Sequence, residues 1–112
     1  MFKLNQSASF FWPVVVNIPS DNGNFEKQTF DGEFKRLTDA RLREIRAKVE
    51  ADEITDAQFV REVMVGWKGV TDEGEPVPFS EGNLEKMLQV SGVAGAVIHA
   101  VVESLTGLKR KN

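Results

Sequence analysis

The first third of the chain carries the residue pattern of paired strands. Residues 10–18 are rich in aromatic and β-branched side chains, and residues 25–34 place aromatic residues among charged ones. The turn residues between them, with Gly23 free to adopt positive φ, predict a β-hairpin. Pro13 lacks the amide donor that a central strand needs, so the first strand is predicted at a sheet edge. An isolated hairpin is only marginally stable, so we expect another strand or a neighbouring subunit beside it.

The pattern then changes to the helical period. Helices are predicted at residues 39–51, 56–65, 81–90 and 93–105. Thr38, Thr55 and Ser80 can each cap a helix start, and each lies between two apolar residues at the spacing of a hydrophobic staple. Gly66 is predicted to end the second helix in a left-handed cap, and Gly107 to close the fourth. These signals predict an α+β fold, in which an N-terminal β-hairpin is followed by about four helices.

Residues 66–79, between the second and third helices, are predicted to form a long ordered loop packed across the helices. Trp67 stands between two glycines and is either a core plug that fixes this loop or an exposed anchor for a partner. Asp72, Glu73 and Glu75 lack the spacing of a calcium loop and the separation of paired glycosidase carboxylates. We therefore interpret these acids as solvent-exposed turn residues.

The predicted fourth helix is apolar over more than one stripe, which includes Val97, Val101 and Leu105. A small domain seldom covers such a helix on all sides, so the helix is either central to the fold or packed against another subunit. His99 is the only histidine, and no serine or acid stands at a recognisable catalytic spacing from it. We interpret it as a surface or interface residue, and the chain is not predicted to be an enzyme.

Length and composition limit the classes of protein to which this chain can belong. A chain of 112 residues, 41 % hydrophobic and 28 % charged, is typical of one globular domain, with flexible ends expected at residues 1–9 and 108–112. The absence of cysteine excludes disulfides, thiolate metal sites and a cysteine nucleophile, and we expect no metal or cofactor. A net charge of −3 disfavours nucleic acid as the main partner. No stretch resembles a signal peptide or reaches the roughly 20 apolar residues of a membrane span, so we expect a cytoplasmic protein without membrane association.

Five segments together resemble one protein family. They are F-F-W-P at residues 10–13, F-K-R-L at 34–37, F-V-R-E-V-M-V-G-W-K-G-V at 59–70, P-F-S at 78–80 and E-S-L-T-G at 103–107. Their order and spacing are similar to those of the tail assembly chaperones of long-tailed bacteriophages and prophages, over nearly the whole chain from Phe10 onward. The chain departs from the family pattern in its last helix, where an aromatic residue is expected near Ala100 or Val101.

The resemblance implies a non-enzymatic role. A protein of this family binds the tape measure protein, a long helical polypeptide, and keeps it soluble while tail tube protein polymerises around it. The resemblance also implies a homo-oligomer that has two further partners, a frameshifted extended form of itself and the tail tube protein. It implies a location in the cytoplasm of the bacterial host and absence from the mature virion.

We identify candidate contact residues by their apolar character in the loop predicted at residues 66–79 and in the last predicted helix. None of them is carried over from the family as a known binding residue. They are Trp67, Val70, Pro78, Phe79, Val97, Val101 and Leu105. The alternative function is a structural virion protein, such as a head–tail connector or tail-completion subunit, which would be found in finished particles. A regulator that binds duplex DNA is a further class, and the acidic balance of the chain argues against it.

Overall fold

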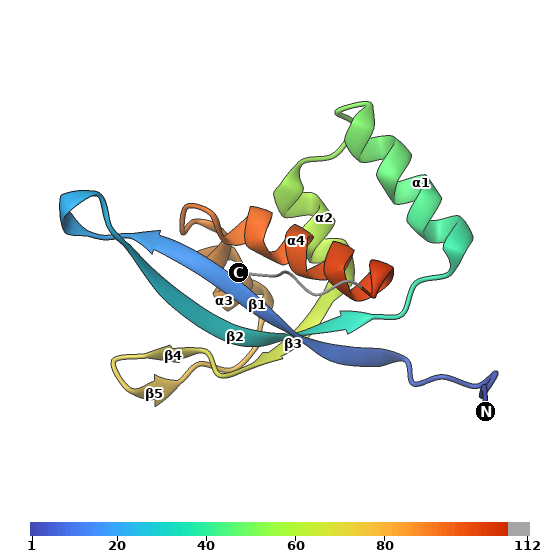
Figure 1. Cartoon of the computed structure of the whole chain (residues 1–112), viewed down its shortest axis with the longest axis horizontal. Coiled ribbons are helices and arrows are strands. Elements are labelled where there is room, and N and C mark those ends of the chain that lie inside the picture. The colour runs from blue at the N-terminus through green and yellow to red at the C-terminus, as the bar shows by residue number, and fades with distance from the viewer. Residues whose placement is uncertain (108–112) are drawn as a thin grey trace.

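A computed structural model describes residues 1–107 and has an α+β fold (Figure 1). A three-stranded antiparallel sheet has the order β1-β2-β3, and a small two-stranded sheet is formed by β4 and β5. The elements follow in the order β1 (Ser9–Pro19), a 3₁₀ turn (Asp21–Gly23), β2 (Phe25–Lys35), α1 (Asp39–Glu50), α2 (Asp56–Val63), β3 (Met64–Lys68), β4 (Thr71–Asp72), β5 (Glu75–Pro76), α3 (Glu81–Leu88) and α4 (Val93–Thr106).

The predicted N-terminal hairpin is confirmed. β1 and β2 pair along their whole length, from Ser9 opposite Lys35 to Pro19 opposite Phe25. β1 lies at the sheet edge, as the proline within it predicts, because no strand pairs with its other side among the described residues. Ser9, the last residue of the predicted flexible end at residues 1–9, belongs to this strand. The other predicted flexible end, residues 108–112, lies outside the described residues.

The prediction for the end of the second helix was wrong. α2 ends at Val63, and Met64 already has the extended backbone of β3, with φ −92° and ψ 124°. Gly66 lies opposite Glu33 in the sheet and does not cap a helix. A Cβ at this position would lie 2.4 Å from a carboxylate oxygen of Glu33, so a glycine suits the close approach of the two strands. β3 is the additional strand that the hairpin was expected to need.

Residues 66–79, here called the central stretch, therefore contain more regular secondary structure than the predicted long loop. The central stretch contains the end of β3 and then the short β4–β5 hairpin, in which Thr71 pairs with Pro76 and Asp72 with Glu75. Glu73 and Gly74 form the turn of this hairpin and have positive φ, at 50° and 81°. The acids of this turn are exposed, as predicted.

The helix starts are confirmed in atomic detail. The hydroxyls of Thr38, Thr55 and Ser80 each accept a hydrogen bond, 3.1 Å long, from the backbone N–H three residues later. Thr55 also has the reciprocal bond of a capping box, because its own N–H donates to the side chain of Gln58 at 2.7 Å. Gly107 closes α4 with φ 70°. α1, α3 and α4 lie where the sequence predicts them, with small differences at their C-terminal ends.

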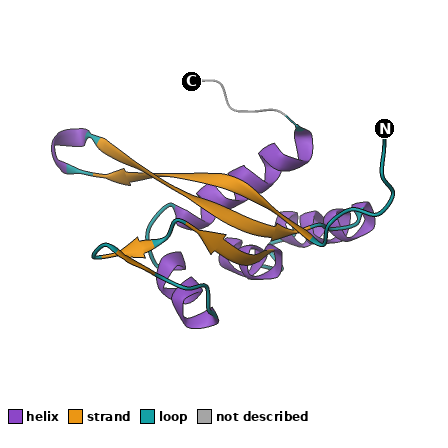
Figure 2. Cartoon of the chain, turned by 90° about the horizontal axis from the view of Figure 1, so that it is seen from below, coloured by secondary structure: helices purple, strands orange, loops and turns teal. Residues whose placement is uncertain are grey.

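The core lies between one face of the sheet and the helices. The helices gather on one side of the hairpin in Figure 1, and the strands pass in front of α4 in Figure 2. Successive β1 side chains alternate between the faces, so Val14 and Val16 are buried while Phe11 and Val15 are exposed. The buried residues on the helices and on β2 and β3 are Phe34, Ile45, Phe59, Val60, Val63, Met64, Leu84, Val93, Val97, Ala100 and Val101.

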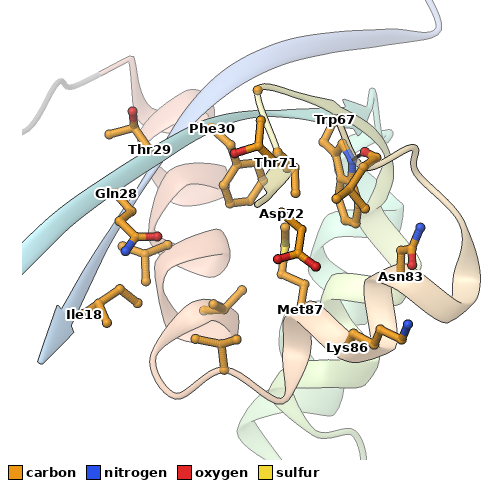
Figure 3. A pocket seen from close by; sticks show the side chains of 16 residues that line it. Ile18, Gln28, Thr29, Phe30, Trp67, Thr71, Asp72, Asn83, Lys86 and Met87 are labelled. Carbon is orange, nitrogen blue, oxygen red and sulfur yellow. Dashed lines mark hydrogen bonds between the residues drawn. The ribbon is translucent and has the colours of Figure 1, made fainter. Parts of the chain in front are cut away.

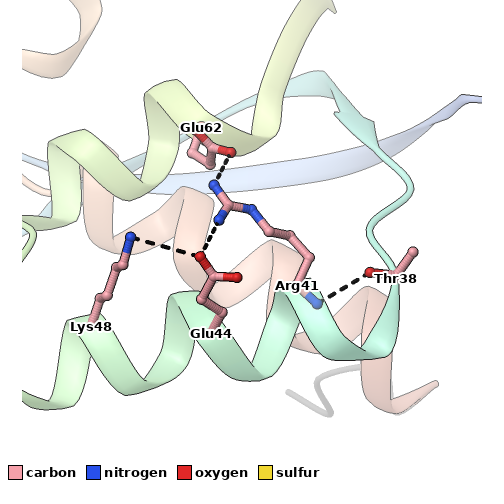
Figure 4. Close-up of polar contacts among 5 residues, drawn as sticks. All are labelled: Thr38, Arg41, Glu44, Lys48 and Glu62. Carbon is pink, nitrogen blue, oxygen red and sulfur yellow. Dashed lines mark hydrogen bonds and ion pairs between the residues drawn. The ribbon is translucent and has the colours of Figure 1, made fainter.

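A polar network on the surface ties α1 to α2 (Figure 4). The guanidinium of Arg41 donates hydrogen bonds to Glu44, in the same helix, and to Glu62 of α2, at 2.7 and 2.6 Å. The hydrogen bond from Arg41 holds the pKa of the Glu62 carboxyl below its ordinary value. Lys48 adds a longer ion pair to Glu44, at 3.8 Å. The network fixes α1 beside α2, where few core side chains reach.

Candidate protein-binding grooves

One concave surface of the protein is a groove of about 470 Å³, here called the first groove. Its walls are the inner face of the hairpin, the segment that contains β3 and β4, and the helix α3 (Figure 3). Most of the lining side chains are apolar, and they come from segments far apart in the sequence. They are Val16, Ile18, Phe30, Trp67, Val70, Val77, Met87, Val90 and Val93. An open apolar groove of this kind is suited to side chains of another protein.

Trp67 is fixed by three contacts at one end of the first groove. Its Nε1 donates a hydrogen bond to the carbonyl oxygen of Val77 at 2.8 Å. Its ring meets those of Phe79 and Phe30 edge-on, with ring centroids 4.9 and 6.4 Å away. These contacts join β3 to β2 and to the segment before α3. Of the two interpretations of Trp67, the structure supports the plug, although the ring also lines the groove.

Polar side chains stand around the rim of the first groove. The charged lining residues among those described are Asp72, on β4, and Lys86, on α3. Figure 3 shows the Asp72 carboxylate projecting toward Met87 in the middle of the groove, with Lys86 farther along α3. Glu73 and Glu75, both exposed, follow Asp72 in the β4–β5 hairpin. The β4–β5 hairpin therefore carries three acidic side chains, of which Asp72 lines the groove.

The second groove has a volume of about 360 Å³ and lies between the start of β1 and the C-terminal half of α4. Its lining includes Phe10, Trp12, Leu37, Leu42, Val101 and Leu105. The guanidinium carbon of Arg36 lies 5.0 Å from the ring centroid of Phe10, a cation–π contact at the mouth of this groove. The ring of Phe10 is thus partly covered by a cation, and the second groove is smaller than the first and has basic lining residues, Lys35 and Arg36.

The residues predicted to contact a partner do not form one surface. In the central stretch, Val70 lines the first groove, Phe79 packs against Trp67, and Pro78 is exposed nearby. The carbonyl of Pro78 accepts a hydrogen bond from the side chain of Asn83 at 2.9 Å, which fixes the entry into α3. These neighbours are brought together by the fold near one end of the first groove.

The prediction for α4 needs a correction. Val97 and Val101 are 0 % and 5 % exposed and belong to the core, because this stripe of α4 packs against β1 and α2. Leu105 is 51 % exposed and lines the second groove, as does the small exposed part of Val101. The sequence left two interpretations of α4 open, a helix central to the fold or a helix packed against another subunit. The structure supports the first for the stripe that contains Val97. Val102, on another face of α4, is half exposed.

Several groove residues were not among the sequence candidates. Phe30, Met87 and Val90 form much of the first groove, yet each belongs to an ordinary strand or helix pattern. Asp72 was interpreted as a turn acid, and its exposure agrees with that interpretation. Its position over an apolar surface depends on how the β4–β5 hairpin packs beside α3. No local feature of the sequence predicts how these two elements pack.

The histidine and the acidic side chains of residues 1–107 do not gather into a metal-binding group. His99 is half exposed, and a carboxylate oxygen of Glu103 lies 3.9 Å from its Nε2. No group of three histidine, aspartate or glutamate side chains in this range has the geometry to hold a metal ion. None of the described helices is by itself long and apolar enough to cross a membrane. α3 and α4 reach that length and composition only together, with a bend of 104° between them.

Comparison with models of protein families, with curated proteins and with solved structures finds no match to this chain.

Proposed function

We propose that this protein is a tail assembly chaperone of a long-tailed bacteriophage or prophage, which binds the tape measure protein and keeps it soluble during tail tube assembly. The order and spacing of the five sequence segments suggest the family. The structural observation that carries the proposal is the first groove, an open surface lined mainly by apolar side chains and rimmed by polar ones. Such a surface can cover the apolar stripe of a helical client.

The shape of this surface agrees with transient binding. Because the first groove is open and presents separate side chains instead of an enclosed pocket, one copy is expected to bind a client segment weakly. Several copies on one long client would together bind it much more tightly, and each could still leave as the tail tube closes around the client. The proposal therefore includes a homo-oligomer in the host cytoplasm. It also includes association with a frameshifted extended form and with tail tube protein, and absence from the finished virion.

The alternative is a structural virion protein, such as a head–tail connector or tail-completion subunit. The observation that favours it is the free edge of β1, next to an open sheet face on which Phe11 and Val15 are exposed. Strand edges of this kind can pair between subunits in a ring, although Pro13 removes one donor from the edge. Presence in mature particles would distinguish this alternative from a chaperone.

The test is co-expression with the tape measure protein encoded by the same phage or prophage, followed by size-exclusion chromatography with light scattering. We expect the client to become soluble and to elute with several copies of this protein. Val70→Asp places a charge in the first groove and should reduce the recovered client. Val15→Asp, on the open sheet face, is the matched control and should not. An insoluble client, together with incorporation of this protein into mature particles, would replace the chaperone proposal by the structural one.

A further inference from the structure

Among residues 1–107, two charged side chains of opposite sign line the first groove, and they belong to different walls, Asp72 to β4 and Lys86 to α3. The carboxylate of Asp72 projects over the apolar floor of the groove (Figure 3), and it forms no hydrogen bond or ion pair with any described residue. Glu73 and Glu75 do not line the groove, but they follow Asp72 in the same β4–β5 hairpin, where Glu75 pairs with Asp72. Lys86 is the only basic side chain that lines the groove among residues 1–107, and it lies on α3. A partner that places basic side chains beside the hairpin would complement this surface.

The walls of the groove favour a partner helix over a partner strand. Phe30 contributes a side chain from a sheet face, Met87 from α3 and Val90 from the turn after α3, and these surfaces can receive an apolar stripe at helical spacing. The nearby outer half of β2 does have a free edge, because β3 pairs only with residues 31–34. That edge carries the charged Glu26 and Lys27, which discourage the addition of another strand.

We propose that the first groove binds an amphipathic helix of the partner protein whose apolar stripe is flanked by lysine or arginine, one of which pairs with Asp72. The inference rests on the proposed function and adds the chemical class of the client segment. The apolar stripe packs against Phe30 and Met87, and the basic flank faces the β4–β5 hairpin. On the opposite flank, Lys86 favours an acidic or neutral side chain. Charge at the rim thereby selects one orientation of the bound helix.

The direct test uses two synthetic helical peptides of about five turns, or roughly 18 residues. They share one leucine–alanine stripe and glutamate along one flank of it, and they carry either lysine or glutamate along the other flank. Fluorescence anisotropy titrations of the full-length protein should show the lysine peptide binding roughly fivefold more tightly, from one attractive pair gained and one repulsive pair avoided. Asp72→Lys should abolish or reverse this preference, and Asp72→Asn should reduce it. Circular dichroism should show that the bound peptide is helical.

The matched control is Glu50→Lys, which makes the same change in net charge at the exposed end of α1. It should retain the preference for the lysine peptide. Equal binding of both peptides by the unmodified protein would overturn the inference, as would equal effects of Glu50→Lys and Asp72→Lys, because the attraction would then reflect overall charge. A gain of β-strand signal on binding would also overturn it, in favour of strand addition to β2.

The failure of this inference can be separated from failure of the proposed function. If the tape measure protein is solubilised by the unmodified protein and equally by Asp72→Lys, chaperoning stands and the groove inference is wrong. If both peptides behave as expected but the tape measure protein is neither bound nor solubilised, the groove is a helix-binding site for another partner. The groove inference then stands and the proposed function fails.

Discussion

Trp67→Ala tests whether this ring is a structural plug. The substitution removes two edge-to-face ring contacts, with Phe30 and Phe79, and the hydrogen bond to the Val77 carbonyl. Each aromatic pair contributes about 0.5–1.5 kcal/mol. The hydrogen bond contributes about 1 kcal/mol. The free energy of unfolding should therefore fall by about 2–4 kcal/mol, less than for a completely buried tryptophan because the ring is only partly buried.

Urea unfolding followed by circular dichroism at constant temperature measures this change. Trp67→Phe keeps the ring contacts but loses the indole N–H, so it should cost about 1 kcal/mol. Phe25→Ala, at the exposed tip of the hairpin, is the control and should change the stability by less than about 0.5 kcal/mol. If Trp67→Ala costs no more than Phe25→Ala, the ring does not hold the central stretch, and the interpretation of Trp67 as an exposed anchor replaces the plug.

Two further predictions concern stability. Gly32→Ala places a Cβ 2.7 Å from the buried ring of Phe34, which cannot move away, so it should destabilise the protein by about 1–3 kcal/mol in urea unfolding. Gly66→Ala has its closest contact with the carboxylate of Glu33, which can rotate away, although the Cβ of Glu33 would also lie 3.3 Å away. It should therefore cost less than Gly32→Ala, and equal costs would contradict this steric argument. The pKa of Glu62 lies below its ordinary value of 4.5 because of the hydrogen bond from Arg41, so the pair stabilises the fold above that value and loses its effect as pH falls through the lower folded pKa. Glu62→Gln should therefore make the loss of stability between about pH 5 and pH 2 shallower, and an unchanged pH profile of urea unfolding would refute this assignment.

The sequence predicts best those structural features that depend on interactions between residues close together in the chain. The caps at Thr38, Thr55 and Ser80 need only a hydroxyl and the backbone three residues later, so their positions follow from the sequence. The hairpin is similar, because its two strands are joined by a turn that contains Gly23, with φ 76°. The acidic turn is predicted as exposed for the same local reason.

β3 shows where this reasoning fails. The first residues of β3 continue the helical apolar pattern of α2. A glycine such as Gly66 is also common just after the end of a helix. Its actual role depends on Glu33, which lies before both α1 and α2 in the chain and comes next to Gly66 only in the sheet. A strand that pairs at long range carries little local signal when it is only five residues long.

The candidate site was predicted only in part for a related reason. Trp67 and Val70 were found because large apolar residues in a Gly-rich stretch are conspicuous, and both line the first groove. The sequence could not show that Val97 and Val101 belong to the core and not to a partner-binding surface, because α4 is apolar on more than one stripe and its pattern does not predict which stripe the sheet covers. Met87 and Asp72 become neighbours of the same groove only after α3 packs beside the β4–β5 hairpin.

The packing of α4 against β1 joins the last described helix to the first strand. During synthesis, Val14 and Val16 leave the ribosome long before Val97 and Val101, which help to bury them. The nascent chain therefore exposes an apolar strand until nearly all of its residues are available, and the core cannot close progressively from the N-terminus. Removal of α4 would uncover the inner face of the sheet, so a truncated chain is expected to aggregate and to be degraded instead of persisting as a smaller domain.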